Sequence, residues 1–445
     1  MLRKTILLIG ACVITCMGST LLKAQINKID FTEYDLENGL HVILHKDNTT
    51  PIVAVSIMYH VGSKNESADR TGFAHFFEHL MFEGSENIKR GEFFKIAQNA
   101  GAENNANTTF DRTFYYEILP SNQLELGLWM EAERLRHLRI DSTGVETQRK
   151  VVKEERSQSY DNQPYGSLME QTFAHAYKVH PYKWTPIGST QYIDKATLSE
   201  FIEFHDMYYV PENATLSIAG DIDINKTKDF IKKYFEDISR GKKSIVRPKV
   251  VEPPQTNEVR DIVYDNIQLP AVVFAYHMPA QGTEDSYALS MLTTLLSDGQ
   301  SSRLYKSVVD KQQKALNAVA FPFALEDPGL FMMYGISNVG VTAEDLEKAI
   351  DQEIEKVKEN LITDNEYQKV RNKVESEFIT RNSTVAGIAE TLANYHIYFG
   401  DSNLINTEIS RYMKVKREDI RNVAKKYLTK ENRVVLYYLP KTQQK

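Results

Sequence analysis

Two histidines and a glutamate stand together in the run His75-Phe76-Phe77-Glu78-His79. On a helix, residues four apart lie one above the other on the same face, so both imidazoles can reach one ion. Zinc favours such nitrogen ligands in tetrahedral geometry. Glu78 lies beside that face, where its carboxylate can act as the general base for an attacking water molecule. The motif therefore predicts a zinc site that carries out a hydrolysis, with His75 and His79 as metal ligands and Glu78 as the catalytic residue.

The residues around the motif predict a helix over 72–83 that is buried on nearly every side. Two imidazoles and a carboxylate are costly to bury without partners, and a bound cation is the simplest partner. The alternative is a pair of core histidines that bind no metal. The apolar neighbours are Phe73, Ala74, Phe76, Phe77, Leu80, Met81 and Phe82.

A catalytic zinc ion needs a third protein ligand and one open position. Glu154 and Glu155 lie in a segment that we expect to be helical, over 143–160. Adjacent helical residues point about 100° apart, so only one of the two can face the metal. The residues alone leave both candidates open.

Several blocks of the chain, together with the motif, resemble the pitrilysin and mitochondrial-processing-peptidase family of inverzincin metallopeptidases. The resemblance covers nearly the whole chain after its first residues. It implies that Glu155 is the third zinc ligand, with Glu154 as the alternative. The matching blocks are Val61-Gly62-Ser63, Arg70 to Ala74, Asn105 to Thr113, His180-Pro181-Tyr182, Ile187-Gly188, Pro211 to Ala214, Gly220-Asp221 and Ser301 to Tyr305.

The resemblance also implies a shape and a way of binding substrate. Two similar α+β domains would form half of a clamshell, and two halves would enclose a chamber. A peptide would be held as an added strand on a sheet edge near the zinc ion, through main-chain hydrogen bonds. We assign that substrate-binding edge to Asn105, Ala106, Asn107 and Thr108. The alternative is a plain β-strand without a binding role.

The chain departs from the family pattern in its second half. Active chambers of the family use an Arg and a Tyr that contact the substrate backbone. The matching positions here are Val309 and Leu316, or Asp310 and Asn317 in a register shifted by one. The departure predicts a heterodimer in which this chain bears the zinc motif and a homologous partner supplies the Arg and Tyr. The alternatives are a self-sufficient homodimer and a non-catalytic scaffold subunit.

A second departure lies close to the third ligand. Family members often carry an acidic residue seven positions before that ligand, and this chain has Gln148 there. We therefore expect a neutral amide behind the site. The other histidines are scattered, and we expect each to be a surface or hydrogen-bonded residue. They are His41, His45, His60, His137, His175, His205, His277 and His396, whereas His180 lies in one of the matching blocks and is expected to be structural.

Alternating strand-like and helix-like segments predict an α+β fold with helices against mostly antiparallel sheets. Strands are expected at 52–61, 104–119, 214–221, 259–278 and 434–439. Further helices are expected at 90–100, 124–138, 227–238, 287–297, 303–312, 343–360 and 364–381. Residues 239–257 hold three prolines and little periodicity, which predicts a linker. The domains are then 25–238, with the zinc site, and 258–445, metal-free and of similar fold.

A weak repeat relates the two halves. Leu80 to Ser85 and Leu295 to Gln300 are similar at low stringency. In this alignment the three motif residues fall opposite Ser290, Thr293 and Thr294, which cannot replace them as zinc ligands. Only the first half is therefore expected to hold metal.

The first residues predict a secretory signal peptide over 1–24. Arg3 and Lys4 precede an uncharged run over 5–22, and Ala24 is a small residue suited to cleavage. The protein is then expected in the periplasm. The alternatives are an uncleaved anchor or a lipid attached near Cys12.

Composition excludes several classes of protein. Apolar residues make up 42% and charged residues 25%, as in a soluble globular protein, and the net charge of −7 argues against nucleic acid as a partner. Both cysteines, Cys12 and Cys16, fall within the predicted signal. The mature protein would therefore contain no disulfide and no thiol nucleophile.

Overall fold

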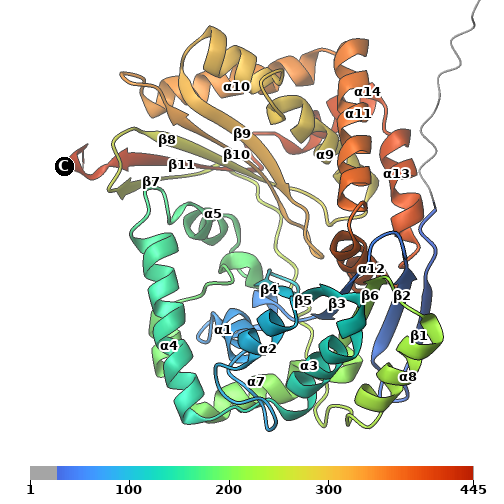
Figure 1. Cartoon of the computed structure of the whole chain (residues 1–445). Helices are drawn as coiled ribbons and strands as arrows, with labels where there is room; N and C mark the ends of the chain where they lie inside the picture. The colour runs from blue at the N-terminus through green and yellow to red at the C-terminus, as the bar shows by residue number, and fades with distance from the viewer. Residues whose placement is uncertain (1–27, 444–445) are drawn as a thin grey trace, which may run out of the picture.

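The computed structural model describes residues 28–443 and contains two β-sheets with helices packed against them (Figure 1). The first sheet has the order β1-β2-β6-β3-β5-β4 and the second has the order β7-β11-β8-β10-β9. Only β2 with β6 and β7 with β11 pair in parallel among these neighbours. The predicted α+β class with two similar halves is confirmed. The strands are β1 (Thr32–Asp35), β2 (His41–Lys46), β3 (Ile52–Tyr59), β4 (Glu103–Thr108), β5 (Thr113–Pro120), β6 (Ala214–Gly220), β7 (Val259–Asp265), β8 (Ala271–His277), β9 (Ala315–Phe323), β10 (Leu330–Ser337) and β11 (Arg433–Pro440).

The two halves repeat one topology. From β2 onward, the strand order of the first sheet matches that of the second, strand for strand. Helix α1 (Phe73–Leu80) follows β3, and helix α9 (Glu284–Ser297) follows the equivalent strand β8. In α9 the hydroxyls of Ser290, Thr293 and Thr294 donate to main-chain carbonyls four residues back. The second half thus has no metal-ligating side chains at these three positions.

The halves exchange helices across their contact. Helix α12 (Val385–Phe399) belongs to the second half of the chain but packs on β3 and β6 of the first sheet. Helix α5 (Leu168–Ala176) belongs to the first half but packs on β8 and β11 of the second sheet. Apolar side chains bury both contacts, for example Leu392 against Ile43 and Phe173 against Val273. Burial of this kind holds the halves together through the hydrophobic effect.

The segment predicted to be a linker contains no helix or strand. Its side chains nevertheless fix it to both halves, and Gln255 donates to the Arg433 carbonyl of the second half at 2.7 Å. Arg247 donates to the His60 carbonyl and to Asn213. The Glu252 carboxylate accepts the backbone N–H groups of residues 178, 179 and 180, at 2.7–3.0 Å. The domain boundaries at 238 and 258 stay a prediction.

Most predicted helices are present, but several segments differ from the prediction in detail. The helix expected over 303–312 is mainly a π-helical stretch, η6 (Tyr305–Lys311), and the strand expected over 104–119 is divided into β4 and β5. The segment 259–278 is two strands, because Pro270 has no N–H for a ladder and the chain turns before β8. Helix α4 (Ser142–Arg156) ends earlier than expected and continues as a π-helical turn over Ser157–Asp161. The remaining helices are α2 (Phe93–Asn99), α3 (Leu124–His137), α6 (Thr190–Lys195), α7 (Leu198–Tyr208), α8 (Ile224–Phe235), α10 (Ala343–Glu359), α11 (Asp364–Arg381), α13 (Leu404–Lys414) and α14 (Arg417–Tyr427).

Within residues 28–443, no helix has both the length and the apolar character needed to cross a lipid bilayer. The predicted signal peptide, residues 1–24, lies outside the described part of the chain.

An ion cluster around the buried Lys64 and Asp111 joins the two halves next to η1 (Ser63–Asn65). The Lys64 ammonium lies 2.9 Å from Asp111, 2.5 Å from Glu326 and 3.1 Å from Asp327. Burial by itself would raise the pKa of Glu326, but the hydrogen bond from His60 and the nearby charges of His60 and Lys64 lower it to about 2. The cluster therefore depends on an ionised Glu326 and on a cation between the carboxylates.

We expect Lys64→Met to lower the free energy of unfolding by about 3–5 kcal/mol, because the buried carboxylate of Asp111 would lose its cation. Urea unfolding at neutral pH measures this. The matched control is Lys426→Met, whose exposed pair with Asp285 should contribute less than about 1 kcal/mol. The folded-state pKa of Glu326 is depressed, so its contribution is present above the unfolded pKa and is lost as pH falls through about 2. Equal stability losses in the two variants would contradict the assignment.

Candidate metal centre

Helix α1 is held by aromatic packing on the side away from its histidines. The Phe73 and Phe76 rings stack on Phe201 of α7, with centroids 4.6 and 4.5 Å away. Phe77 stacks on Phe204 of the same helix, at 5.6 Å. This packing fixes the rotation of α1, so the predicted metal-binding face is turned toward α4 and β4, which both contact α1.

The N-terminus of α1 is held by a carboxylate from outside the helix. Glu66 accepts the N–H of Gly72 at 2.9 Å and that of Ala74 at 2.8 Å. Burial raises the pKa of Glu66 to about 8, although these N–H donors oppose the rise. Gly72 adopts a φ of 96°, and a Cβ on Gly188 would come within 2.3 Å of it. Both glycines are therefore required for the close approach of two segments at the start of the helix.

The side chains of His75, His79 and Glu155 converge. The two Nε2 atoms of the histidines lie 3.3 Å apart. Glu155 places one oxygen 3.5 Å from His75 Nε2 and the other 3.1 Å from His79 Nε2. Ligands about 2.1 Å from a tetrahedral zinc ion would lie roughly 3.4 Å apart, so this nitrogen and carboxylate set fits zinc in both donor type and spacing.

Only one of the two candidate glutamates faces the histidines. Hydrogen bonds from His75 and His79 hold the pKa of Glu155 well below its usual range, against the opposing effect of burial. Glu154 is exposed and accepts a hydrogen bond from Gln158 at 2.6 Å instead. The rotation of α4 thus turns Glu155, and not Glu154, toward the histidines, a choice that the residues alone leave open.

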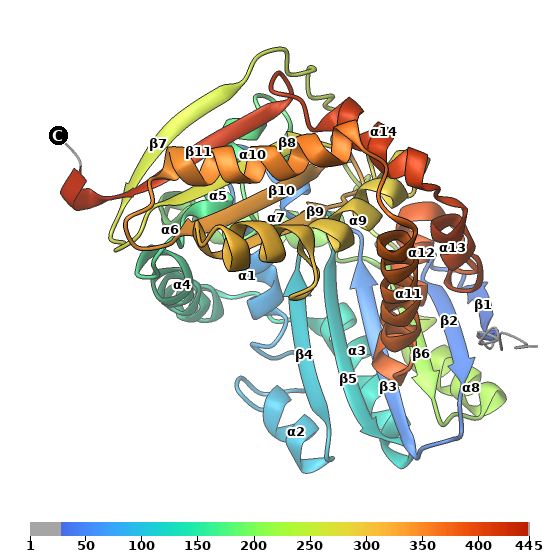
Figure 2. The same ribbon diagram turned by 90° about the horizontal axis from the view of Figure 1, so that it is seen from above.

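The substrate edge predicted at Asn105 to Thr108 lies on β4, at the free edge of the first sheet (Figure 2). Thr108, at the end of β4, donates its hydroxyl to Glu78 Oε2 at 2.6 Å. Asn107 accepts a hydrogen bond from Arg112 at 2.6 Å, and Asn105 accepts the N–H of Ala106 at 2.8 Å. The edge strand therefore runs directly to the predicted catalytic carboxylate.

The role of Glu66 at the N-terminus of α1 and the hydrogen bond from Thr108 to Glu78 were not predicted from the sequence. For Glu66 a signal exists, because an acidic residue near the N-terminus of a helix complements its unpaired N–H groups. For Thr108 no local signal exists, since the strand and the helix meet only in the folded chain.

Gln148 contacts a different carboxylate from that of the third ligand. Its amide donates to Glu83 at 2.6 Å, and Glu83 also pairs with Arg90 at 2.5 Å. The neutral amide expected behind the site is thus engaged with the buried Glu83, which also pairs with the exposed Arg90.

The positions that match the Arg and Tyr of the family's active chambers lie in the second half. Val309 packs partly buried against the core of that half, whereas Leu316 on β9 is 55% exposed. In the shifted register, the Asn317 side chain accepts the Ile336 N–H at 3.3 Å. None of these side chains, nor Asp310, can provide a cation or a phenol.

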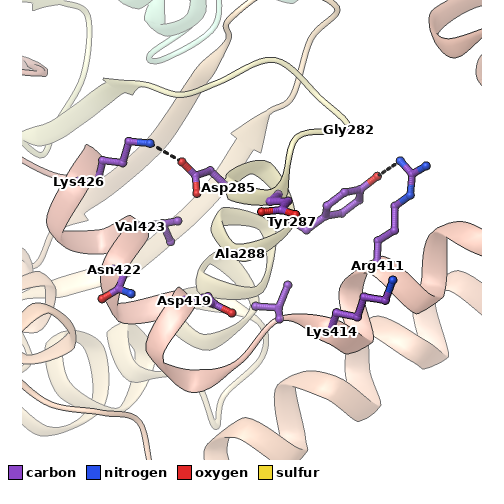
Figure 3. Close-up of a pocket in the computed structure, with 12 residues that line it drawn as sticks. Gly282, Asp285, Tyr287, Ala288, Arg411, Lys414, Asp419, Asn422, Val423 and Lys426 are labelled. Atoms are coloured by element: carbon purple, nitrogen blue, oxygen red, sulfur yellow. Dashed lines mark hydrogen bonds and ion pairs between the residues drawn. The ribbon is translucent and has the colours of Figure 1, made fainter.

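A cavity of about 610 Å³ lies between α9, α13 and α14 (Figure 3). Two of its cations are already engaged, Lys426 with Asp285 at 2.6 Å and Arg411 with the Tyr287 hydroxyl at 3.3 Å. No residue of the predicted metal and substrate site lines it. The cavity is therefore separate from the candidate centre.

Comparison with known proteins matches both halves of the chain. Residues 41–188 match the family described as insulinase (peptidase family M16), and residues 195–374 match the peptidase M16 inactive domain. The zinc protease PqqE of Helicobacter pylori is 34% identical over 408 residues, which cover 91% of this chain and 92% of PqqE. An uncharacterized zinc protease of Rickettsia felis is 24% identical over 400 residues, covering 90% of this chain and 95% of that protein.

Solved structures agree with these matches. The crystal structure of a protease from Helicobacter pylori has a TM-score of 0.90 at 33% identity and covers 93% of this chain and 100% of its own. The periplasmic protease PqqL from Escherichia coli has a TM-score of 0.76 at 16% identity. That match covers 93% of this chain but 48% of PqqL. At that identity the likeness concerns the fold alone, and this chain corresponds to half of the longer protein.

Proposed function

Because this chain belongs to peptidase family M16, the insulinase family, we propose that it is a zinc-dependent endopeptidase whose site lies in its first half. The observation that carries the proposal is the convergence of His75, His79 and Glu155 at tetrahedral spacing, with Glu78 beside them. These three side chains would hold the ion. When bound, zinc supplies a Lewis acid that polarises the scissile carbonyl and activates water.

The residues of the chain would carry the proton steps. Glu78 accepts the proton of the attacking water and then passes it to the leaving amine. Thr108 donates to one oxygen of Glu78 and thereby fixes the orientation of the carboxylate. Proton transfer requires the Glu78 carboxylate to lie within hydrogen-bond reach of the reacting atoms. The contact with Thr108 favours such a position.

The substrate would be a peptide or an unfolded polypeptide. An extended segment can pair with the main chain of β4 over Asn105 to Thr108, and such pairing tolerates varied side chains. The proposal is supported by the place of β4 at the sheet edge and by the contact of its last residue with Glu78.

We further propose that a homologous chain completes the active chamber as a heterodimer. Val309, Leu316, Asp310 and Asn317 cannot contact a substrate backbone as Arg and Tyr would. The correspondence of this chain to half of PqqL is consistent with a second, related half. Secretion to the periplasm is proposed on Arg3, Lys4 and the uncharged run that follows them.

A peptide-cleavage assay tests the function. The purified chain, mixed with the product of a neighbouring gene of the same family, should cleave unstructured peptides. Cleavage should stop with a chelator and return with zinc. Full activity of the chain alone would remove the need for a partner. No cleavage by any mixture, with zinc present, would favour a non-catalytic scaffold.

We expect Thr108→Val to lower kcat about ten- to a hundredfold with little change in KM, because Glu78 would lose a charge-assisted hydrogen bond while the β4 main chain stays intact. Steady-state kinetics on one peptide measures both constants. Thr407→Val, on the surface of α13, is the control and should match the unchanged protein. A rise in KM alone would mean that Thr108 acts on substrate binding and not through Glu78.

A further inference from the structure

A second group of metal-ligating side chains lies far along the chain from the first. Glu33 on β1, His41 on β2 and His396 on α12 each offer one ligand atom, and these atoms all lie within 4.8 Å of one another. His41 Nε2 is 3.4 Å from Glu33 Oε2. The His41 and His396 rings stack with centroids 3.4 Å apart and planes 6° from parallel. The group therefore combines residues from both halves of the chain.

The contacts around this group orient His41 toward it. His41 Nδ1 donates to Asp35 Oδ1 at 2.7 Å, since a carboxylate only accepts. The other nitrogen, Nε2, is buried and has no hydrogen-bond partner among the described residues. Its lone pair and the Glu33 carboxylate oxygen would repel each other across 3.4 Å unless a cation lies between them. Glu33 is exposed and so partly solvated, whereas His41 is buried, and a positive charge at this point would satisfy the buried nitrogen.

We propose that Glu33, His41 and His396 form a second divalent-metal site, with zinc as the best-matched ion. Two imidazoles and one carboxylate are a donor set that zinc favours. The surrounding contacts have the form seen around bound metals, where a histidine ligand donates its other N–H to a carboxylate. Asp35 does this for His41, and Ser402 donates to Glu33 Oε2 at 2.6 Å. The site is independent of the proposed peptidase function.

Binding requires one ring to turn. An ion cannot lie in the plane of two parallel rings at once, so ion uptake must rotate the His396 ring, which is less buried than His41. The outer torsion of histidine is broad and permits this. Burial and the nearby His41 ring lower the pKa of His396 to about 4, although the Glu33 and Asp35 charges oppose the shift.

The ion would join the two halves where they already pack together. Near this group, the apolar side chains of α12, including Ile388 and Leu392, cover Ile43 of β2. An ion bound by β1, β2 and α12 would add a cross-link to that contact. Because it binds only the folded chain, zinc should raise the unfolding temperature through this site.

The test removes the histidines of the first candidate site and measures how many zinc ions the proposed second site binds. We expect the His75→Ala/His79→Ala double variant of the full chain, dialysed against micromolar zinc, to retain one zinc per chain by mass spectrometry. Adding His396→Ala should remove that ion and abolish the rise in unfolding temperature on zinc addition. His137→Ala, at a surface histidine paired with Glu86, is the matched control and should keep the ion.

Conservative variants guard against loss of folding. In the double-variant background, Asp35→Asn should weaken zinc binding about ten- to a hundredfold, as removal of a supporting contact does. Glu33→Gln, which removes a ligand charge, should weaken it at least as much. A double variant that is folded but binds no zinc would overturn the proposal, and would mean that a proton on His41 supplies the positive charge. Zinc binding that His396→Ala leaves unchanged would also overturn it.

Discussion

The Glu78→Gln variant is expected to keep its zinc ion and to lose turnover by about a hundredfold to ten-thousandfold. The amide has nearly the same shape as the carboxylate but cannot accept and return the proton, and general base catalysis typically contributes this much. Glu78 is not one of the three converging ligand side chains, so metal content should not change. Metal analysis and kcat/KM on one peptide, measured on the same preparation, separate the two effects.

Glu86→Gln provides a control for this variant. Glu86 is exposed and pairs with His137 at the surface, so its substitution removes one charge without touching the site. Its kcat/KM should equal that of the unchanged protein. If Glu78→Gln retained most of its activity, Glu78 would have no role as the base. If it lost zinc together with activity, the result would point to ligation instead.

Helix α1 could be predicted from the sequence because the information is local. The spacing of His75 and His79 places both on one face of any helix, and the phenylalanines around them require that helix to be buried. The alternation of strands and helices likewise gave the α+β class. The choice between Glu154 and Glu155 was different, since it depends on how α4 is rotated against α1. Only the family resemblance favoured Glu155 before the fold was known.

The exchange of helices between the halves could not be predicted from the sequence. The apolar face of α12 indicates that the helix packs on something, but not that it packs on a sheet formed more than 160 residues earlier, at β6. The proximity of His41 and His396 could not be predicted either, because in the sequence they are isolated histidines. Their proximity follows from the placement of α12 on the first sheet. Residues that meet through long-range packing carry no local signal of that contact.

Adjacent glutamates on one helix give the sharpest test of the proposed third ligand. We expect Glu155→Gln to bind one zinc ion fewer per chain than the unchanged protein at micromolar zinc, and to lose peptide cleavage at that concentration. Removing a supporting contact already weakens metal binding about ten- to a hundredfold, and loss of a direct ligand should exceed that. Equilibrium dialysis followed by metal analysis measures the ion count, and cleavage is followed as zinc is added back.

Glu154→Gln is the matched control, because it makes the same chemical change one residue away. Its side chain is exposed and contacts Gln158, so zinc content and cleavage should both be retained. The two variants remove equal charge from the same turn of α4, and general electrostatic effects on the ion should therefore be similar. A difference between them isolates direct ligation by Glu155. Loss of zinc in Glu154→Gln alone would mean that α4 is rotated by about 100° in the metal-bound protein.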